Sequence, residues 1–274
     1  MGFELPEILK ISRQMQDKLI GKKIKDITLT DYSKSIIKQG MSNLDKRQND
    51  ILNTHIKKIT PKGKWIFLEF ENDNFLMFGE IIGKFLYLEK RQSLPQKYHV
   101  KFQFDDDSNM TFQSSLYAFL TVATMEEKRN HRYAGNIGPS PNEIGFSPKY
   151  FKRILLQNDK KPIKAVLNMQ EQLSGLGNAY INDILFEAKI HPKTKSSELN
   201  SEEKDKLYDS IIKVIKFAIE LGGSLDECDI FGKSGGYTRI VDKNTSECKR
   251  CKSKIQKENI LGSSSYYCPA CQKI

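Results

Sequence analysis

Four cysteines near the end of the chain have the spacing of a metal site. Cys248 and Cys251 form one C-x2-C pair, and Cys268 and Cys271 form a second pair after sixteen intervening residues. A C-x2-C turn directs two sulfur atoms toward one point, and Zn²⁺ takes four tetrahedral ligands, for which thiolates are well suited. The spacing predicts one structural zinc ion with a closed thiolate shell. Two disulfides are the alternative, and Cys228 is expected to be an ordinary thiol.

A glycine-containing turn is the second segment with a chemical role. It reads Leu-Ser-Gly-Leu-Gly-Asn-Ala-Tyr over residues 173–180, between two predicted helices. Bare glycine backbone lets a phosphate group come close, and the N–H groups at a helix start attract anions. Asn178 can cap that helix or donate to phosphate. An ordinary helix–helix turn with glycine C-caps is the alternative.

The net charge of the chain favours a polyanionic partner. The 274 residues include 44 Lys and Arg against 34 Asp and Glu, a net charge of +10. Nucleic acid is the first candidate and an anionic membrane surface the second, although an AT-rich genome also produces many lysines. No apolar run approaches the ~18 residues that span a bilayer, and the opening residues lack a secretory pattern. A soluble, cytoplasmic protein is therefore expected.

The elements that must position these groups are of two kinds. Apolar residues at helical spacing predict one helix over 4–20, ended by Gly21. Residues 24–124 alternate as strands separated by polar turns, which indicates an all-β body. After a loop-like stretch at 125–146, helical patterns cover 147–158, 161–173, 178–189 and 200–221. The fold class predicted is α+β.

Several short motifs occur along the chain in one order. They are E-L-P-E at 4–7, G-K-W at 63–65, G-P-S-P at 138–141, G-L-G-N-A-Y-I-N-D-I-L-F at 175–186, I-H-P at 190–192 and C-P-A-C-Q at 268–272. Together they resemble the formamidopyrimidine-DNA glycosylase / endonuclease VIII family of base-excision repair enzymes. The resemblance implies an N-terminal helix with a β-sandwich at 1–128, a linker at 129–145, a helix–two-turn–helix domain at 146–223, and a connector with a zinc finger hairpin at 224–274.

The resemblance also implies a reaction. In the family an N-terminal proline amine attacks C1′ of a flipped-out damaged nucleotide, forms a Schiff base, and the strand is cut by elimination. Glu4 matches the glutamate that transfers protons, Glu7 the second glutamate of the opening motif, and Lys64 a lysine of the β-sandwich. Helix capping is the alternative role for the two glutamates, and a solvated strand position is the alternative for Lys64.

The implied partner is double-stranded damaged DNA, held between the domains of a monomer. Gly175 and Asn178 match the turn that holds phosphate, and Lys164 matches a lysine before that turn which also touches the DNA backbone. The implied cofactor is the single structural Zn²⁺.

Two places depart from the family pattern. The chain opens Met-Gly-Phe-Glu where the family has Met-Pro-Glu, so Phe3 stands at the nucleophile position with an amide nitrogen. Loss of Met1 would expose an amine at Gly2, which begins one residue, or roughly 3 Å, too far out. In the finger, Gly262-Ser263-Ser264-Ser265 stands where the family has a hairpin arginine that grips DNA.

The residues that would fill the gap left by a flipped base are also altered. Phe78, Ile81, Tyr117 and Phe119 are candidates for a wedge, and the sandwich core is the alternative place for them. Asp183 replaces the usual glutamate in the helix–two-turn–helix block. The lesion itself does not follow from the sequence.

Three functions follow from these observations. The first is a DNA glycosylase that cleaves the N-glycosidic bond through water with help from Glu4, with strand cleavage weak or absent. The second is a catalytically inactive relative that binds damaged DNA. The third is a zinc-ribbon module that binds protein.

Overall fold

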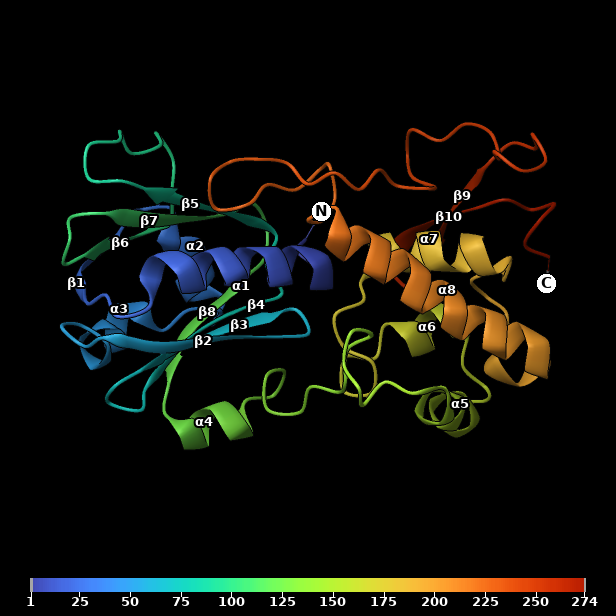
Figure 1. Cartoon of the computed structure of the whole chain (residues 1–274), viewed down its shortest axis with the longest axis horizontal. Helices are drawn as coiled ribbons and strands as arrows, with labels where there is room; N and C mark the ends of the chain where they lie inside the picture. Colours follow the sequence, from blue (N-terminus) through green and yellow to red (C-terminus); the bar gives the residue numbers. More distant parts are fainter. Residues whose placement is uncertain (1, 274) are drawn as a thin grey trace. The chain divides into compact units, whose positions relative to one another are not determined.

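A computed structural model describes residues 2–273. Met1, on whose removal an amine at Gly2 depends, lies outside the described residues. The chain forms two compact units, of which the first runs to Asn136 and includes Gly222–Gly236, and the second comprises Ile137–Leu221 and the chain from Tyr237 onward (Figure 1). Among the described residues no helix is long and apolar enough to cross a membrane.

The first unit contains one long helix and eight strands with a few short helices between them. Its elements are α1 (Leu5–Leu19), β1 (Ile24–Leu29), α2 (Ser33–Lys38), α3 (Leu44–Arg47), η1 (Gln48–Asp50), β2 (Ile56–Lys62), β3 (Trp65–Phe70), β4 (Phe75–Gly79), β5 (Gly83–Leu88), β6 (Val100–Phe104), β7 (Asn109–Ser114), β8 (Phe119–Ala123) and α4 (Met125–Asn130).

The strands form two antiparallel four-stranded sheets that share an aromatic core. Their orders are β1-β6-β7-β5 and β2-β3-β4-β8. Phe78 of the second sheet meets Phe85 and Phe102 of the first, with ring centroids 5.0 and 6.1 Å apart. All three rings are fully buried. Buried and partly exposed residues alternate along β6, whereas β3 and β4 are almost entirely buried. Each sheet packs an apolar face against the other. The predicted α+β class with an N-terminal β-sandwich is confirmed.

Helix α1 starts at an acidic capping box and packs against β2 and β3. Its apolar residues recur at helical spacing and are buried, as the sequence pattern predicts. Helix α4 occupies the first six residues of the stretch 125–146, which the sequence predicts as loop-like, so the prediction is wrong for 125–130 and holds for 131–146. Thr124 and Glu127 cap its first turn reciprocally, with bonds of 3.2 and 2.7 Å. This T-x-x-E signal is visible in the sequence.

The second unit is helical and carries the hairpin. Its elements are α5 (Pro148–Gln157), α6 (Ile163–Leu167), α7 (Asn178–Ala188), η2 (Ser196–Glu198), α8 (Ser201–Glu220), β9 (Gln256–Ile260) and β10 (Ser263–Tyr267). The apolar helix α7 packs against α8 on one side and β10 on another, which explains why it is buried almost all round. The predicted start of α8 at Asn200 with Glu203 is confirmed as a capping box.

The prediction of one helix over 161–173 is wrong, because α6 ends at Leu167. Beyond it, Gln170 replaces helical bonds with bonds from its own side chain. Its amide nitrogen donates to the Leu176 carbonyl at 2.7 Å, and its oxygen accepts from the Gly175 N–H at 2.9 Å. Gly175 has a φ of +88°, a region that favours glycine. The segment before α7 is therefore a turn held by a side chain.

Candidate functional site

The four ribbon cysteines form a metal centre. Their sulfur atoms all lie within 4.8 Å of one another. The Cys251–Cys268 and Cys248–Cys271 pairs are separated by 3.4 and 3.9 Å. Four thiolates around a tetrahedral zinc with 2.3 Å bonds lie about 3.8 Å apart, so the donor set fits zinc. The separations are too long for disulfides, and the cysteines are free. The predicted structural zinc site is confirmed, and Cys228 lies outside it.

The segment from Cys248 to Gln272, which carries the four cysteines and is called the ribbon below, packs against the C-terminal part of α7. Gln272 donates to the Ile190 carbonyl at 2.9 Å, and the Arg250 guanidinium lies 4.4 Å from the centre of the Phe186 ring. Arg250 also donates to the Phe186 carbonyl at 2.6 Å, near the helix end where carbonyl groups lack helical partners. These contacts place the hairpin β9–β10 beside the start of the same helix.

A buried aspartate joins α7 to the segment that leads into the ribbon. Asp183 accepts bonds from the Tyr237 hydroxyl and from the N–H groups of Ile240 and Val241, at 2.9, 3.0 and 3.0 Å. Burial raises the pKa of Asp183 to about 6 despite these donors, and burial together with the Asp183 charge raises the pKa of Tyr237. No sequence motif points to Tyr237.

The opening segment is held by backbone of the β4–β5 turn. The Phe3 N–H donates to the Ile81 carbonyl at 2.8 Å. The Phe3 ring is 1 % exposed and stacks on Phe85 in the sandwich core. A Cβ at Gly2 would lie 2.9 Å from the Ile81 oxygen, so the close approach requires glycine. Phe3 is thus an anchor with a bonded amide, and it cannot serve as a nucleophile.

Glu4 and Glu7 lie together at the start of α1. Both are 5 % exposed and form a reciprocal capping box. One oxygen of Glu7 accepts from the Glu4 N–H at 3.0 Å, and the other accepts from the Ser224 N–H at 2.7 Å. Ser224 belongs to the 222–236 segment and was not singled out by the sequence. The capping alternative is thus present in the fold, while the catalytic roles of Glu4 and Glu7 stay a prediction.

Lys64 lies near the same turn. Its ammonium nitrogen is 3.4 Å from a carboxylate oxygen of Glu80, and its side chain is 12 % exposed. Glu80 directly precedes Ile81, which holds Phe3. The structure therefore brings Gly2 and Lys64 to neighbouring residues of one turn, and the catalytic role of Lys64 stays a prediction.

Two of the residues predicted to hold phosphate, Lys164 and Asn178, contact the hairpin instead of lying open. The Lys164 ammonium lies within 3.1 Å of four oxygens of residues 260–265 and is 3 % exposed. The Asn178 amide donates to the Ser264 carbonyl and accepts from the Ser263 hydroxyl, both at 2.9 Å. Burial lowers the pKa of Lys164 to about 8. Phosphate binding by Lys164, Asn178 and Gly175 stays a prediction.

The candidates for a side chain that fills the gap left by a flipped base differ in burial. Phe78 and Ile81 are fully buried and Phe119 is 9 % exposed, so these three belong to the core. Tyr117 is half-buried, and its neighbour Leu116 is 74 % exposed. The sequence pattern did not select Leu116, since exposure of an apolar residue has no signal in hydropathy.

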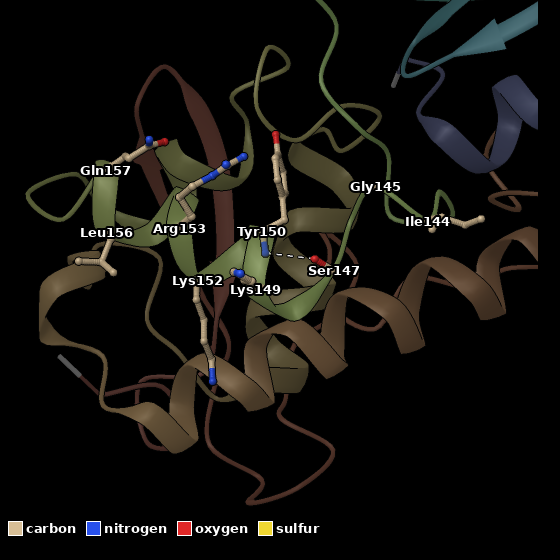
Figure 2. A pocket seen from close by; sticks show the side chains of 9 residues that line it. All are labelled: Ile144, Gly145, Ser147, Lys149, Tyr150, Lys152, Arg153, Leu156 and Gln157. Atoms are coloured by element: carbon tan, nitrogen blue, oxygen red, sulfur yellow. Dashed lines mark hydrogen bonds between the residues drawn. The ribbon is translucent and has the colours of Figure 1, made fainter.

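A shallow pocket of about 680 Å³ lies over α5. None of the predicted site residues lines it, and its side chains are basic, polar and apolar. In Figure 2, Ile144 lies well apart from Leu156. The pocket is lined by Ile144, Gly145, Ser147, Lys149, Tyr150, Lys152, Arg153, Leu156 and Gln157.

Three sequence profiles match most of the chain. Residues 3–115 match the formamidopyrimidine-DNA glycosylase N-terminal domain, 137–228 match the formamidopyrimidine-DNA glycosylase H2TH domain, and 246–274 match the zinc finger found in FPG and IleRS. Together they cover the β-sandwich, the helices and the ribbon described above.

Curated relatives match over the full length. A formamidopyrimidine-DNA glycosylase of Ligilactobacillus salivarius is 30% identical over 279 residues, 99% of each chain. One of Streptococcus pneumoniae is 29% identical over 277 residues, 98% of each chain. The fold is similar to Lactococcus lactis Fpg in complex with abasic-site DNA, with a TM-score of 0.86, 28% identity, and coverage of 99% and 100%. MutM in complex with carbocyclic 8-oxo-G DNA has a TM-score of 0.85 at 28% identity and the same coverage.

Proposed function

The chain belongs to the formamidopyrimidine-DNA glycosylase family, and from this membership we propose that it is a base-excision-repair DNA glycosylase. It flips a damaged base out of duplex DNA and cleaves the N-glycosidic bond. The observation that carries the proposal is the full-length match to such enzymes, with a glutamate pair retained at the start of α1. The comparisons give no support to an inactive relative or to a protein-interaction module.

The chemistry at the N-terminal segment uses water. The Phe3 nitrogen is an amide, and its lone pair is delocalised into the carbonyl of the peptide bond, so it cannot attack C1′. Its N–H also donates to the Ile81 carbonyl. Water adds to C1′ as the N-glycosidic bond breaks, and the proton that the water loses passes to the Glu4 carboxylate. The base leaves with the bonding electron pair and takes a proton from solvent, and Glu4 returns its proton to solvent, so the net reaction is the addition of one water. No Schiff base forms by this route, and strand cleavage by elimination is weak or absent. An amine at Gly2 exists only where Met1 has been removed.

Glu7 positions Glu4 in this scheme. Its two carboxylate oxygens bind the Glu4 N–H and the Ser224 N–H, so it fixes the helix start and the 222–236 segment together. Lys64 supports the reaction as a phosphate contact. The DNA substrate binds a monomer in the cytoplasm, and the zinc ribbon supports binding without taking part in the bond-breaking step.

Base release tests the proposal. Duplexes carrying an oxidised purine or an oxidised pyrimidine are incubated with the chain, and free base is measured. Glu4→Gln should lower the rate at least 100-fold, in keeping with roughly 10²–10⁴-fold for a general acid–base group. Its affinity for a duplex with an abasic-site analogue should stay within about threefold, because binding groups are unchanged. Glu126→Gln makes the same change at an exposed position of α4 and should leave the rate unaltered.

Borohydride trapping separates the water route from an amine route. The water route predicts no covalent adduct with damaged or abasic DNA. A strong adduct would show that an amine still attacks, and N-terminal mass spectrometry would then tell whether Gly2 is the first residue. Failure to release any base and to bind the abasic-site duplex would overturn the proposed function itself.

A further inference from the structure

The tip of the hairpin β9–β10 is a tight turn with unusual backbone angles. Leu261 and Gly262 have φ values of 55° and 76°. Two successive residues with positive φ give the turn whose twist matches the flanking strands. Glycine adopts such angles readily, but leucine does not, so the turn needs contacts from outside to hold it.

Those contacts come from one buried ammonium group. Lys164 lies 3.0 Å from the Ile260 carbonyl, 3.1 and 2.8 Å from the carbonyl and hydroxyl of Ser263, and 2.7 Å from the Ser265 hydroxyl. An ammonium has three N–H donors, and these four acceptors surround it on the hairpin. The Lys164 side chain is therefore satisfied within the chain, on both sides of the turn.

Two asparagines of α7 hold the same tip. The Asn178 amide donates to the Ser264 carbonyl at 2.9 Å, and Asn182 donates to that carbonyl at 3.3 Å. The Ser263 hydroxyl donates to the Asn178 oxygen at 2.9 Å while it accepts from Lys164. Serine suits this place because its hydroxyl both accepts and donates. A basic side chain at 263 could only donate and would bring a second positive charge beside the ammonium.

We propose that Lys164 is the positioning residue of the hairpin, which holds the Leu261–Gly262 turn against the start of α7 and does not itself contact a DNA phosphate. Lys164 then affects DNA binding indirectly, because it fixes the positions of Ser263 and Ser265. The inference rests on the proposed function only in assuming that the hairpin takes part in DNA binding. The burial that lowers the pKa of Lys164 to about 8 agrees with a group turned away from solvent.

The first test needs no DNA. Backbone hydrogen exchange at residues 260–265 and zinc release to a chelator are measured for the zinc-loaded full chain. Lys164→Met should speed exchange at the turn roughly tenfold, since a charge-assisted network is lost. Lys149→Met removes the same charge from the exposed face of α5 and should change exchange less than twofold. Unaltered exchange in Lys164→Met would overturn the proposal.

A double variant separates positioning from a general loss of stability. Ser265→Ala removes one acceptor of the ammonium with little change of shape, and it should also speed exchange at the turn. If Lys164 acts through this serine, Lys164→Met with Ser265→Ala should be no faster than Lys164→Met alone, within about twofold. Independent, multiplied effects would contradict the proposal. Ser265→Ala alone keeps the test available if Lys164→Met does not fold.

The second test uses the salt dependence of binding to a duplex with an abasic-site analogue. Positioning predicts about tenfold weaker binding for Lys164→Met with an unchanged slope of log K against log salt. A direct phosphate contact predicts a slope smaller by about 0.9 together with normal exchange at the turn, and this result would overturn the proposal. If the unaltered chain binds no DNA, the proposed function fails, while the exchange experiment still decides the role of Lys164.

Discussion

The zinc ribbon and the N-terminal segment both carry family motifs, but different parts of the chain hold them in place. In the ribbon, the four ligands lie within 24 positions of one another in the sequence and their sulfur atoms converge within 4.8 Å. At the N-terminus, Glu4 and Glu7 depend on two distant segments, because Ile81 holds Phe3 and Ser224 holds Glu7. A local site is robust to change elsewhere, whereas an assembled site responds to each supporting segment.

The largest effect should come from breaking the local site. Cys248→Ser removes one thiolate, and structural zinc in small modules contributes about 10–16 kcal/mol of folding free energy. We expect the ribbon to lose its zinc to a chelator and its backbone to exchange freely, while exchange at the Glu7–Ser224 contact of the first unit stays as it was. Zinc analysis and hydrogen exchange measure this.

Cys228→Ser is the matched control, because Cys228 lies outside the cluster and the change is chemically the same. It should alter neither zinc content nor exchange at the ribbon. Full zinc retention in Cys248→Ser would show that the ribbon is not held by its four thiolates.

A medium effect should come from the junction between α7 and the ribbon, where Asp183 is buried. Its pKa is raised from 3.8 to about 6, so the folded state holds the proton more tightly than the unfolded state does. The contribution of Asp183 to the free energy of unfolding is complete below about pH 4. It is lost as the pH rises to about 6, by about 3 kcal/mol in all. The asparagine in Asp183→Asn does not titrate. The free energy of unfolding of this variant minus that of the unaltered chain should therefore rise between pH 4 and pH 6.

Urea unfolding at pH 4, 5, 6 and 7 measures the difference. The exposed Asp209 of α8, changed to Asn, serves as the control for loss of a carboxylate. If the difference in free energy of unfolding between Asp183→Asn and the unaltered chain stays constant from pH 4 to pH 7, the pKa of Asp183 is not raised by folding.

The smallest effect should come from the assembled site. Gly223 has a φ of +93°, and a Cβ there would lie 2.8 Å from a Glu7 oxygen. Gly223→Ala should cost about 2 kcal/mol, from backbone strain plus the weakened Glu7–Ser224 bond, and should slow base release. Gly21→Ala adds the same methyl at a φ of +81° with nothing within 4 Å, so it should cost about 1 kcal/mol and leave base release alone. Equal losses of stability and of base release in both variants would show that Glu7 does not connect the start of α1 to the 222–236 segment.

Much of the fold follows from local sequence patterns. The helix over 5–19, the strand alternation and the capping of α8 each depend on neighbours in the chain. Helix α4 had a readable cap at Thr124 and was still missed because its apolar content is low. The predicted continuation of the helix beyond Leu167 is wrong for another reason. The side chain of Gln170 bonds to the backbone of the following turn, and glutamine as a residue type does not predict such bonds.

The sequence alone determined the zinc ligands, the change from a β-rich to a helical half, and the family, because each depends on residue types at short or ordered spacing. Only the tertiary structure decided that Phe78, Ile81 and Phe119 are core, and which partners hold Lys164 and Glu7. Those partners lie 96 to 101 residues from Lys164 and 217 residues from Glu7. Several of them are backbone groups, which every residue carries, so the pairing leaves no mark in the sequence and exists only once the chain has folded.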